Sequence, residues 1–165
     1  MRYSLRAEDL SFPERADVRL DFHHRIARSP ADVFAILAAH EQWPRWFRDL
    51  RKVEAVGPDG QGVGARRRVW LGPLQLEERF IAWEPGARFS FTMVGANVPG
   101  LAAMLEDWRL SPADGGAACE VDYTVALDLP GPLRSARRAL PVPLRWMLGR
   151  ALPGLARYAV GARVP

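Results

Sequence analysis

Residues 25–50 read RIARSPADVFAILAAHEQWPRWFRDL and contain the end of a strand, a capped helix and an aromatic bend. Ser29 followed by Pro30 is typical of a helix start, because serine caps the free backbone amides and proline lacks only a donor that the first turn does not use. Apolar residues then recur at helical spacing, which predicts a short helix to about His40. Pro44 predicts the start of a second short helix, so we expect a bent helix pair.

The segment before this stretch alternates between apolar and polar residues. In VRLDFHHRI (residues 18–26), Leu20, Phe22, His24 and Ile26 share one face, while His23 belongs to the other face. Alternation with a period of two is typical of a strand that is buried on one side. We therefore expect His24 to point inward and His23 to point outward.

After Leu50 the chain reads as strands separated by Gly- and Pro-rich turns at intervals of about a dozen residues. Successive strands joined by short turns indicate an antiparallel meander. From residue 133 onward, leucines recur every three or four residues, which predicts a C-terminal helix that Pro141, Pro143 and Pro153 interrupt or bend. The strands are expected at residues 51–57, 65–71, 74–83, 88–94, 101–110 and 119–129.

Four phrases, in this order and spacing, resemble a known superfamily. They are residues 25–50 above, VGPDGQGVGARRRV (56–69), FIAWEPGARFSF (80–91) and WRLSPADGGAACEVDYTV (108–125). Together they resemble the START-like helix-grip superfamily, also called SRPBCC, and especially its bacterial polyketide cyclase/dehydrase and lipid-transport-like branch. The specificity lies in the order and spacing of the phrases, since each is degenerate alone.

The resemblance implies an α+β helix-grip fold, in which a curved antiparallel sheet of about seven strands wraps around a long C-terminal helix. Two short helices follow the first strand. We expect residues 1–165 to form a single START-like domain, with residues 1–17 as an N-terminal extension. A hollow between sheet and helix receives apolar or amphipathic small molecules in such proteins, but the superfamily does not fix one activity.

Composition narrows the possibilities further. At 165 residues and 48% hydrophobic, the chain fits one ordinary globular domain, and no stretch approaches the roughly 18 apolar residues of a membrane span. Cys119 is the single cysteine, which excludes an intrachain disulfide or thiolate cluster, and the histidines lack metal-ligand spacing. GQGVGA (60–65) precedes a strand rather than a helix, so it does not indicate a nucleotide site. We expect a cytoplasmic protein with no metal, nucleotide or other cofactor.

Large aromatic and methionine side chains are the candidate ligand-binding residues, because such side chains tolerate imperfect fit to an apolar molecule. Each has two interpretations, as solid core or as cavity wall, and in a helix-grip fold one surface can serve as both. The candidates are Trp43, Trp46, Phe47, Phe89, Phe91, Met93, Met104, Trp108 and Tyr123.

Three polar residues are candidate acid or base catalysts. Glu106 shares its strand phase with apolar neighbours, so an inward carboxyl would have a raised pKa, unless Arg66 or Arg68 pairs with it. With His24 and Tyr123, Glu106 could move protons in an aldol-type cyclisation and dehydration. Nothing in the sequence shows that the three converge.

The C-terminal segment is strongly basic. No acidic residue follows Asp128, whereas seven arginines do. A peripheral membrane contact through Arg134, Arg137, Arg138 and Arg145 is therefore one hypothesis, and nucleic acid is a weaker one. Since Lys52 is the only lysine, arginine is also the ordinary cation of this chain.

Three functions follow from these patterns. We expect binding or carriage of a small hydrophobic molecule, such as a lipid, isoprenoid or polyketide-like aromatic. The first alternative is a cyclase or dehydratase that uses the inward acid and base residues. The second is a membrane- or partner-binding protein that uses the basic helix. The sequence leaves the ligand, turnover and the oligomeric state open.

Overall fold

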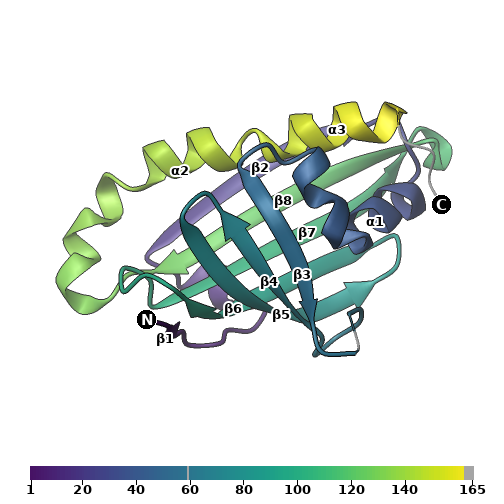
Figure 1. Ribbon diagram of the computed structural model, residues 1–165. Coiled ribbons are helices and arrows are strands. Elements are labelled where there is room, and N and C mark those ends of the chain that lie inside the picture. The colour runs from purple at the N-terminus through teal and green to yellow at the C-terminus, as the bar shows by residue number, and fades with distance from the viewer. Residues whose placement is uncertain (59, 162–165) are drawn as a thin grey trace.

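The computed structural model describes residues 1–58 and 60–161 and contains one curved antiparallel sheet (Figure 1). The strand order is β2-β8-β7-β6-β5-β4-β3, with β1 paired to β6. The predicted meander and the α+β helix-grip fold are confirmed. The strands are β1 (Tyr3–Ser4), β2 (Val18–Ile26), β3 (Leu50–Val56), β4 (Arg66–Leu71), β5 (Leu74–Glu84), β6 (Arg88–Ala96), β7 (Ala103–Ala113) and β8 (Ala118–Asp128).

The first 17 residues contribute to the sheet and to a second small core. β1 adds an eighth strand that the sequence did not reveal, because two residues are too few to show alternation. The 3-10 helix η1 (Phe12–Glu14) buries Phe12 against Leu105 and Ala126. These partners alternate with the cavity-lining Met104 and Leu127, so Phe12 covers the sheet face that points away from the C-terminal helices.

The helix pair consists of α1 (Pro30–Ala38) and the 3-10 helix η2 (His40–Arg45). Ser29 caps α1 as predicted, since its hydroxyl accepts from the Asp32 amide at 3.1 Å. The expectation that Pro44 begins the second helix is wrong, because η2 begins at His40 and contains Pro44. The indole Nε1 of Trp43 donates to the Leu37 carbonyl at 2.9 Å and thereby ties the two helices together.

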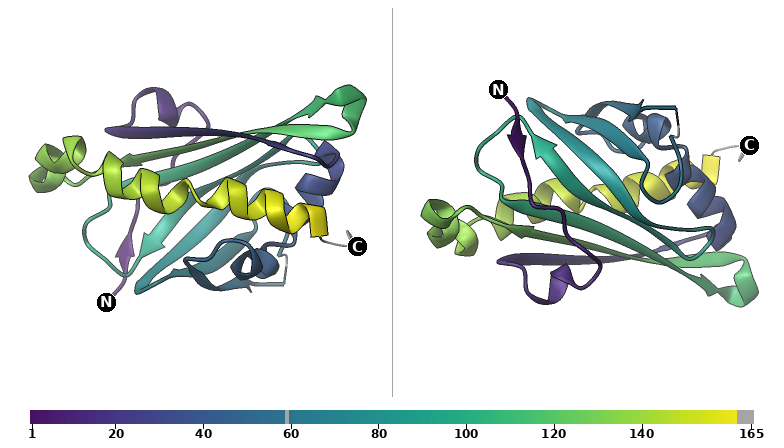
Figure 2. Two further views of the ribbon diagram at one scale, coloured as in Figure 1. Left: turned by 90° about the horizontal axis from the view of Figure 1, so that it is seen from above. Right: turned by 90° about the horizontal axis from the view of Figure 1, so that it is seen from below.

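The C-terminal segment is interrupted, as its prolines predicted. It forms the 3-10 helix η4 (Gly131–Arg138), then α2 (Pro141–Leu148) and α3 (Ala151–Gly161). Pro141 and Pro153 occupy first turns, where a missing backbone donor costs little. α2 and α3 run nearly in line along the concave side of the sheet (Figure 2).

Close contact between α3 and the helix pair requires a glycine. A Cβ atom built on Gly154 would lie 2.2 Å from the Trp46 carbonyl oxygen, so only glycine allows this approach.

The remaining short helix is η3 (Asp114–Gly116), which closes the β7–β8 hairpin. No helix in the described part of the chain is both long and apolar enough to cross a membrane.

Candidate functional site

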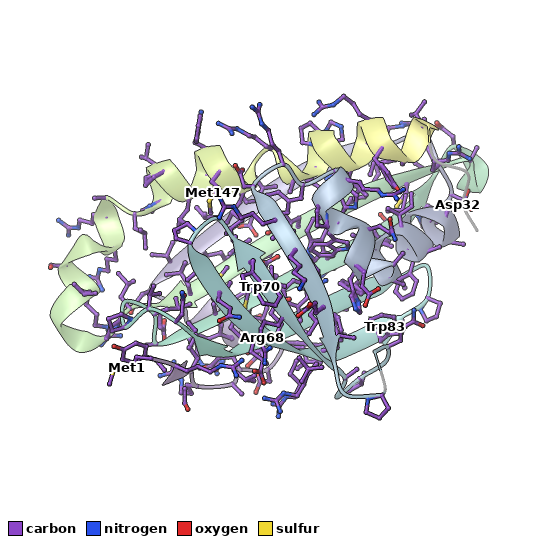
Figure 3. The ribbon with its side chains drawn as sticks, viewed as in Figure 1. Met1, Asp32, Arg68, Trp70, Trp83 and Met147 are labelled. Carbon is purple, nitrogen blue, oxygen red and sulfur yellow. The ribbon has the colours of Figure 1, made fainter. Side chains whose placement is uncertain are left out.

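A cavity of about 200 Å³ lies between the concave face of the sheet and α2. α2 contributes Leu144, Met147 and Leu148 to its wall, and Met147 lies on the sheet-facing side of the helix (Figure 3). The β6–β7 connection contributes Val98 and Leu101. The remaining apolar lining residues are Trp43, Phe47, Leu50, Val69, Leu71, Leu74, Leu76, Phe91, Gly100, Met104, Leu127, Leu129 and Leu140.

Three charged side chains also line the cavity, namely Arg67, Glu78 and Glu106. Arg67 and Glu78 are directly opposite each other on β4 and β5, and Arg67 Nε donates to Glu78 Oε2 at 2.5 Å. Both are buried. Burying a charge is costly unless the charge is paired and hydrogen-bonded. This ion pair therefore offsets part of the cost of burying Arg67 and Glu78.

The Arg67 guanidinium is held between aromatic rings. Its Cζ lies 4.1 Å from the Trp43 ring centroid and 4.4 Å from that of Phe91, which are cation–π distances. Nη1 and Nη2 are buried without a hydrogen-bond partner among the residues that the structure describes. Arg67 therefore keeps donor capacity that its protein neighbours do not use.

Glu106 is a buried acid with a raised pKa. Burial and the nearby Glu78 carboxyl raise the pKa of Glu106 to about 8, against the opposing effects of Tyr123 and Arg67. The Tyr123 hydroxyl donates to Glu106 Oε2 at 2.8 Å, and burial raises the pKa of Tyr123 well above its ordinary value. Burial also raises the pKa of Glu78, although Arg67 opposes this shift. At neutral pH Glu106 therefore holds its proton.

His40 is a further buried titratable group, close enough to Arg67 for the guanidinium charge to affect its pKa. It stacks on Phe80 with ring centroids 5.6 Å apart. Burial, together with the positive charge of Arg67, lowers the pKa of His40 to about 4. The imidazole is therefore neutral at physiological pH.

The structure separates the predicted ligand-binding residues into two groups. Trp43, Phe47, Phe91 and Met104 lie on the cavity wall. The others are buried in the surrounding core, where they support that wall, and a role for any of them in binding stays a prediction. This second group contains Trp46, Phe89, Met93, Trp108 and Tyr123.

The three acid or base candidates do not all come together. Glu106 and Tyr123 are hydrogen-bonded, and the Tyr123 ring stacks between Phe22 and Trp108 at centroid distances of 5.4 and 3.9 Å. His24 lies on the inward face of β2 as expected, but it is only half-buried and is not among the residues that line the cavity. The proposed triad is thus reduced to a pair.

Arg67, rather than Arg66 or Arg68, is the arginine that lines the cavity together with Glu106. Arg66 and Arg68 lie on the opposite face of β4, where both approach Glu77, so neither pairs with Glu106. Arg67 points inward instead, because it alternates in phase with Ala65, Val69 and Leu71. Arg67 and Glu78 were not among the predicted site residues, although their phase within β4 and β5 places both on the inward face.

Comparisons with known proteins agree with this architecture. The family model for polyketide cyclase/dehydrase and lipid transport matches residues 17–160. An uncharacterized protein of Mycobacterium bovis is 34% identical over 150 residues, which cover 90% of this chain and 89% of the relative. A protein of Mycobacterium tuberculosis strain H37Rv, also uncharacterized, matches with the same values.

Solved structures share the fold at low sequence identity. The Zhui aromatase/cyclase from Streptomyces sp. R1128 aligns with a TM-score of 0.70 and 16% identity, over 86% of this chain and 93% of its own. A START superfamily protein from Mycobacterium smegmatis aligns with a TM-score of 0.63 and 13% identity, over 84% and 97% of the two chains. The chain therefore belongs to the polyketide cyclase/dehydrase and lipid transport family, and its fold is that of START-like proteins.

Proposed function

We propose that the protein binds a small hydrophobic molecule in the cavity between the sheet and α2, with an oxygen of that molecule at the Arg67–Glu78–Glu106 cluster. One observation carries the proposal, namely an apolar cavity whose wall includes three buried, ionisable side chains. Apolar walls supply affinity, while a few polar groups fix orientation. Membership of a family that covers both polyketide cyclases and lipid transport supports the same class of ligand.

The size of the cavity limits the ligand. An engineered cavity of about 150 Å³ in another protein accepts benzene, so about 200 Å³ suits a bicyclic aromatic molecule or a short acyl chain. A ligand with several fused rings would have to displace α2 or extend beyond the mouth of the cavity. The proposal therefore favours a ligand of roughly a dozen non-hydrogen atoms.

The polar cluster favours a carbonyl or hydroxyl oxygen. Glu106 holds its proton at neutral pH and can donate it to an acceptor, and two nitrogens of Arg67 have no hydrogen-bond partner within the described part of the chain. A neutral acceptor adds no further charge to a cluster that already contains one guanidinium and two carboxyls. Net gains of about 0.5–1.5 kcal/mol for a hydrogen bond correspond to roughly two- to tenfold in affinity.

A titration with 2-acetylnaphthalene tests this proposal, with 2-ethylnaphthalene as the analogue that lacks oxygen. We expect both to bind and the ketone to bind several-fold more tightly. Leu144→Trp fills the cavity and should abolish binding, while Val142→Trp, on the exposed face of the same helix, should preserve it. If Leu144→Trp left the affinity unchanged, the probe would bind elsewhere and the proposal would be wrong.

Proton transfer is a second candidate function, supported by the Glu106–Tyr123 hydrogen bond and the pKa of Glu106 near 8. When ionised, Glu106 could take a proton from carbon next to a ligand carbonyl. The C–H bond would break, an O–H bond would form on Glu106, and the electron pair would move to the carbonyl oxygen beside Arg67. A catalytic base of this kind typically accelerates a reaction by about 10²- to 10⁴-fold.

Hydrogen–deuterium exchange separates this candidate from simple binding. NMR of 2-tetralone in D₂O reports loss of the protons next to its carbonyl, without requiring the natural substrate. We expect the protein to accelerate this exchange, Glu106→Gln to remove the acceleration, and the exposed Glu41→Gln to retain it. Binding without acceleration would refute the catalytic candidate and leave the binding proposal intact.

A further inference from the structure

Apolar side chains are exposed on η4, on α2 and in the β6–β7 connection. Val142 is 74% exposed, Trp146 70%, Leu133 44% and Val98 36%. Val98 also lines the cavity, and α2 forms one side of that cavity. Exposed apolar side chains therefore lie at the cavity itself, through Val98, beside its lining residue Gly100, through Leu133, and on the outer side of the helix that forms one of its walls. We call these four residues the rim residues.

α2 carries apolar residues on two sides, and only one of these sides faces the cavity. Leu140, Leu144, Met147 and Leu148 face the cavity. Val142 and Trp146 are four residues apart, so they share the opposite face of the helix. This outer face is largely exposed, although the Arg150 guanidinium packs on the Trp146 ring. Adjoining exposed apolar side chains of this kind mark interaction sites.

Arginines surround this face. Arg137, Arg138 and Arg145 are exposed, and Arg150 lies with its Cζ 3.4 Å from the Trp146 ring centroid. From residue 129 to residue 161 there are six arginines and no acidic residue. η4 and the start of α2 extend beyond the edge of the sheet (Figure 1), so approach to a flat surface is not obstructed from that side.

Some of these charges already have partners within the protein. Arg134 binds the Asp17 carboxylate, with Nη2 to Oδ1 at 3.1 Å, and Arg145 donates to the Asp21 backbone oxygen at 3.2 Å. Arg137 lies 4.0 Å from Asp17. Asp49 lies 4.0 Å from Arg150. Two carboxylates thus lie beside five guanidinium groups, those of Arg134, Arg137, Arg138, Arg145 and Arg150, so the surface keeps a net positive charge.

We infer that the rim residues and the adjoining arginines form a docking surface for an anionic lipid bilayer. Tryptophan and valine can enter the boundary between headgroups and acyl chains, while arginines bind lipid phosphates. A second copy of this chain fits the surface poorly, because a symmetric contact would place arginines against arginines. If the proposed function holds, docking brings α2, one wall of the cavity, to the membrane, so that an apolar ligand can enter or leave beside α2 at the membrane surface.

Vesicle co-sedimentation tests this inference. The probes are vesicles of phosphatidylcholine alone and of phosphatidylcholine with 30% phosphatidylglycerol. We expect binding to the anionic vesicles, weakening as NaCl rises from 0.1 to 0.5 M. Each arginine near an anionic surface contributes roughly fivefold to partitioning, so Arg137→Gln combined with Arg138→Gln should lower it roughly thirtyfold. Trp146→Ser should also weaken it several-fold.

Matched variants keep the test specific. Arg79→Gln removes an exposed arginine from β5, away from the rim, and should leave partitioning unchanged. Leu144→Trp should abolish binding of 2-acetylnaphthalene but not of vesicles, which separates docking from the proposed cavity function. Equal binding to neutral and anionic vesicles, no binding to either, or indifference to the arginine and tryptophan substitutions would each overturn the inference. Salt-resistant dimers that require Trp146 would overturn it in favour of a second copy.

Discussion

Tyr123 donates a 2.8 Å hydrogen bond to Oε2 of Glu106, and both side chains are buried within the sheet's concave face. Tyr123 lies on β8 and Glu106 on the adjacent β7, in diagonal rather than directly opposite positions. The bond fixes the orientation of a carboxyl that also contacts the cavity. Glu78, across β6, adds a second carboxyl whose charge disfavours ionisation of Glu106.

Glu106→Gln should make stability less dependent on pH between about pH 4.5 and pH 8. The pKa of Glu106 is about 8 in the folded protein and near 4.5 when unfolded, so between these values the unfolded chain binds fewer protons and stability falls as pH rises. One such group contributes a slope of up to about 1.4 kcal/mol per pH unit. Urea unfolding at pH 6.5, 7.0, 7.5 and 8.0 should show a shallower slope for the variant. An unchanged slope, or an equal change in Glu41→Gln, would contradict this assignment.

His40→Phe should make the protein less sensitive to acid between pH 6.5 and about pH 4. The pKa of His40 falls from 6.5 to about 4 on folding, so between these values the unfolded chain binds more protons and stability falls as pH decreases. This contribution opposes that of Glu106 over much of the same range. Urea unfolding at pH 5.0 and 6.5 should therefore show a larger gain at pH 5.0 for His40→Phe. A variant with the same acid sensitivity as the natural chain would show that the imidazole does not titrate there.

Arg67→Met should destabilise the protein strongly, by about 3–5 kcal/mol, because it leaves Glu78 buried beside Glu106 without a cation. Adding Glu78→Gln should restore much of the loss, since the second substitution removes the unpaired carboxyl. Equilibrium unfolding of both variants at pH 7 measures this difference. If the double variant were no more stable than Arg67→Met, packing on Trp43 and Phe91 rather than charge would explain the effect.

Gly154→Ala should destabilise the contact between α3 and the helix pair. The new Cβ would lie 2.2 Å from the Trp46 carbonyl oxygen, and backbone must move to relieve the overlap. Overpacking of this kind typically costs about 1–3 kcal/mol. Gly161→Ala, at the end of the same helix, has open space around its Cβ and should be neutral or slightly stabilising. Thermal unfolding of the two variants should therefore differ, and equal melting temperatures would exclude a close contact at Gly154.

Several features of the site follow from short-range sequence signals. The tight turn at Gly72 and Pro73 places Leu71 opposite Leu74, and the same register puts Arg67 opposite Glu78. The inward phase of Glu106 and the start of α1 at Pro30 were predicted on similar grounds. Position within one strand or one hairpin depends on neighbours in sequence, so alternation and turn chemistry suffice to infer it.

The sequence by itself determined the order of the elements, the faces of the strands and the helix-grip architecture. Only the tertiary structure decided that Glu78 and Glu106 influence each other across β6, that His24 stays outside the cavity and that Trp46 supports the wall without lining it. These relationships depend on the curvature of the sheet and on how far α2 lies from it. Local patterning fixes which side a residue faces, whereas the space that remains between two packed layers depends on the volumes of all the side chains between them.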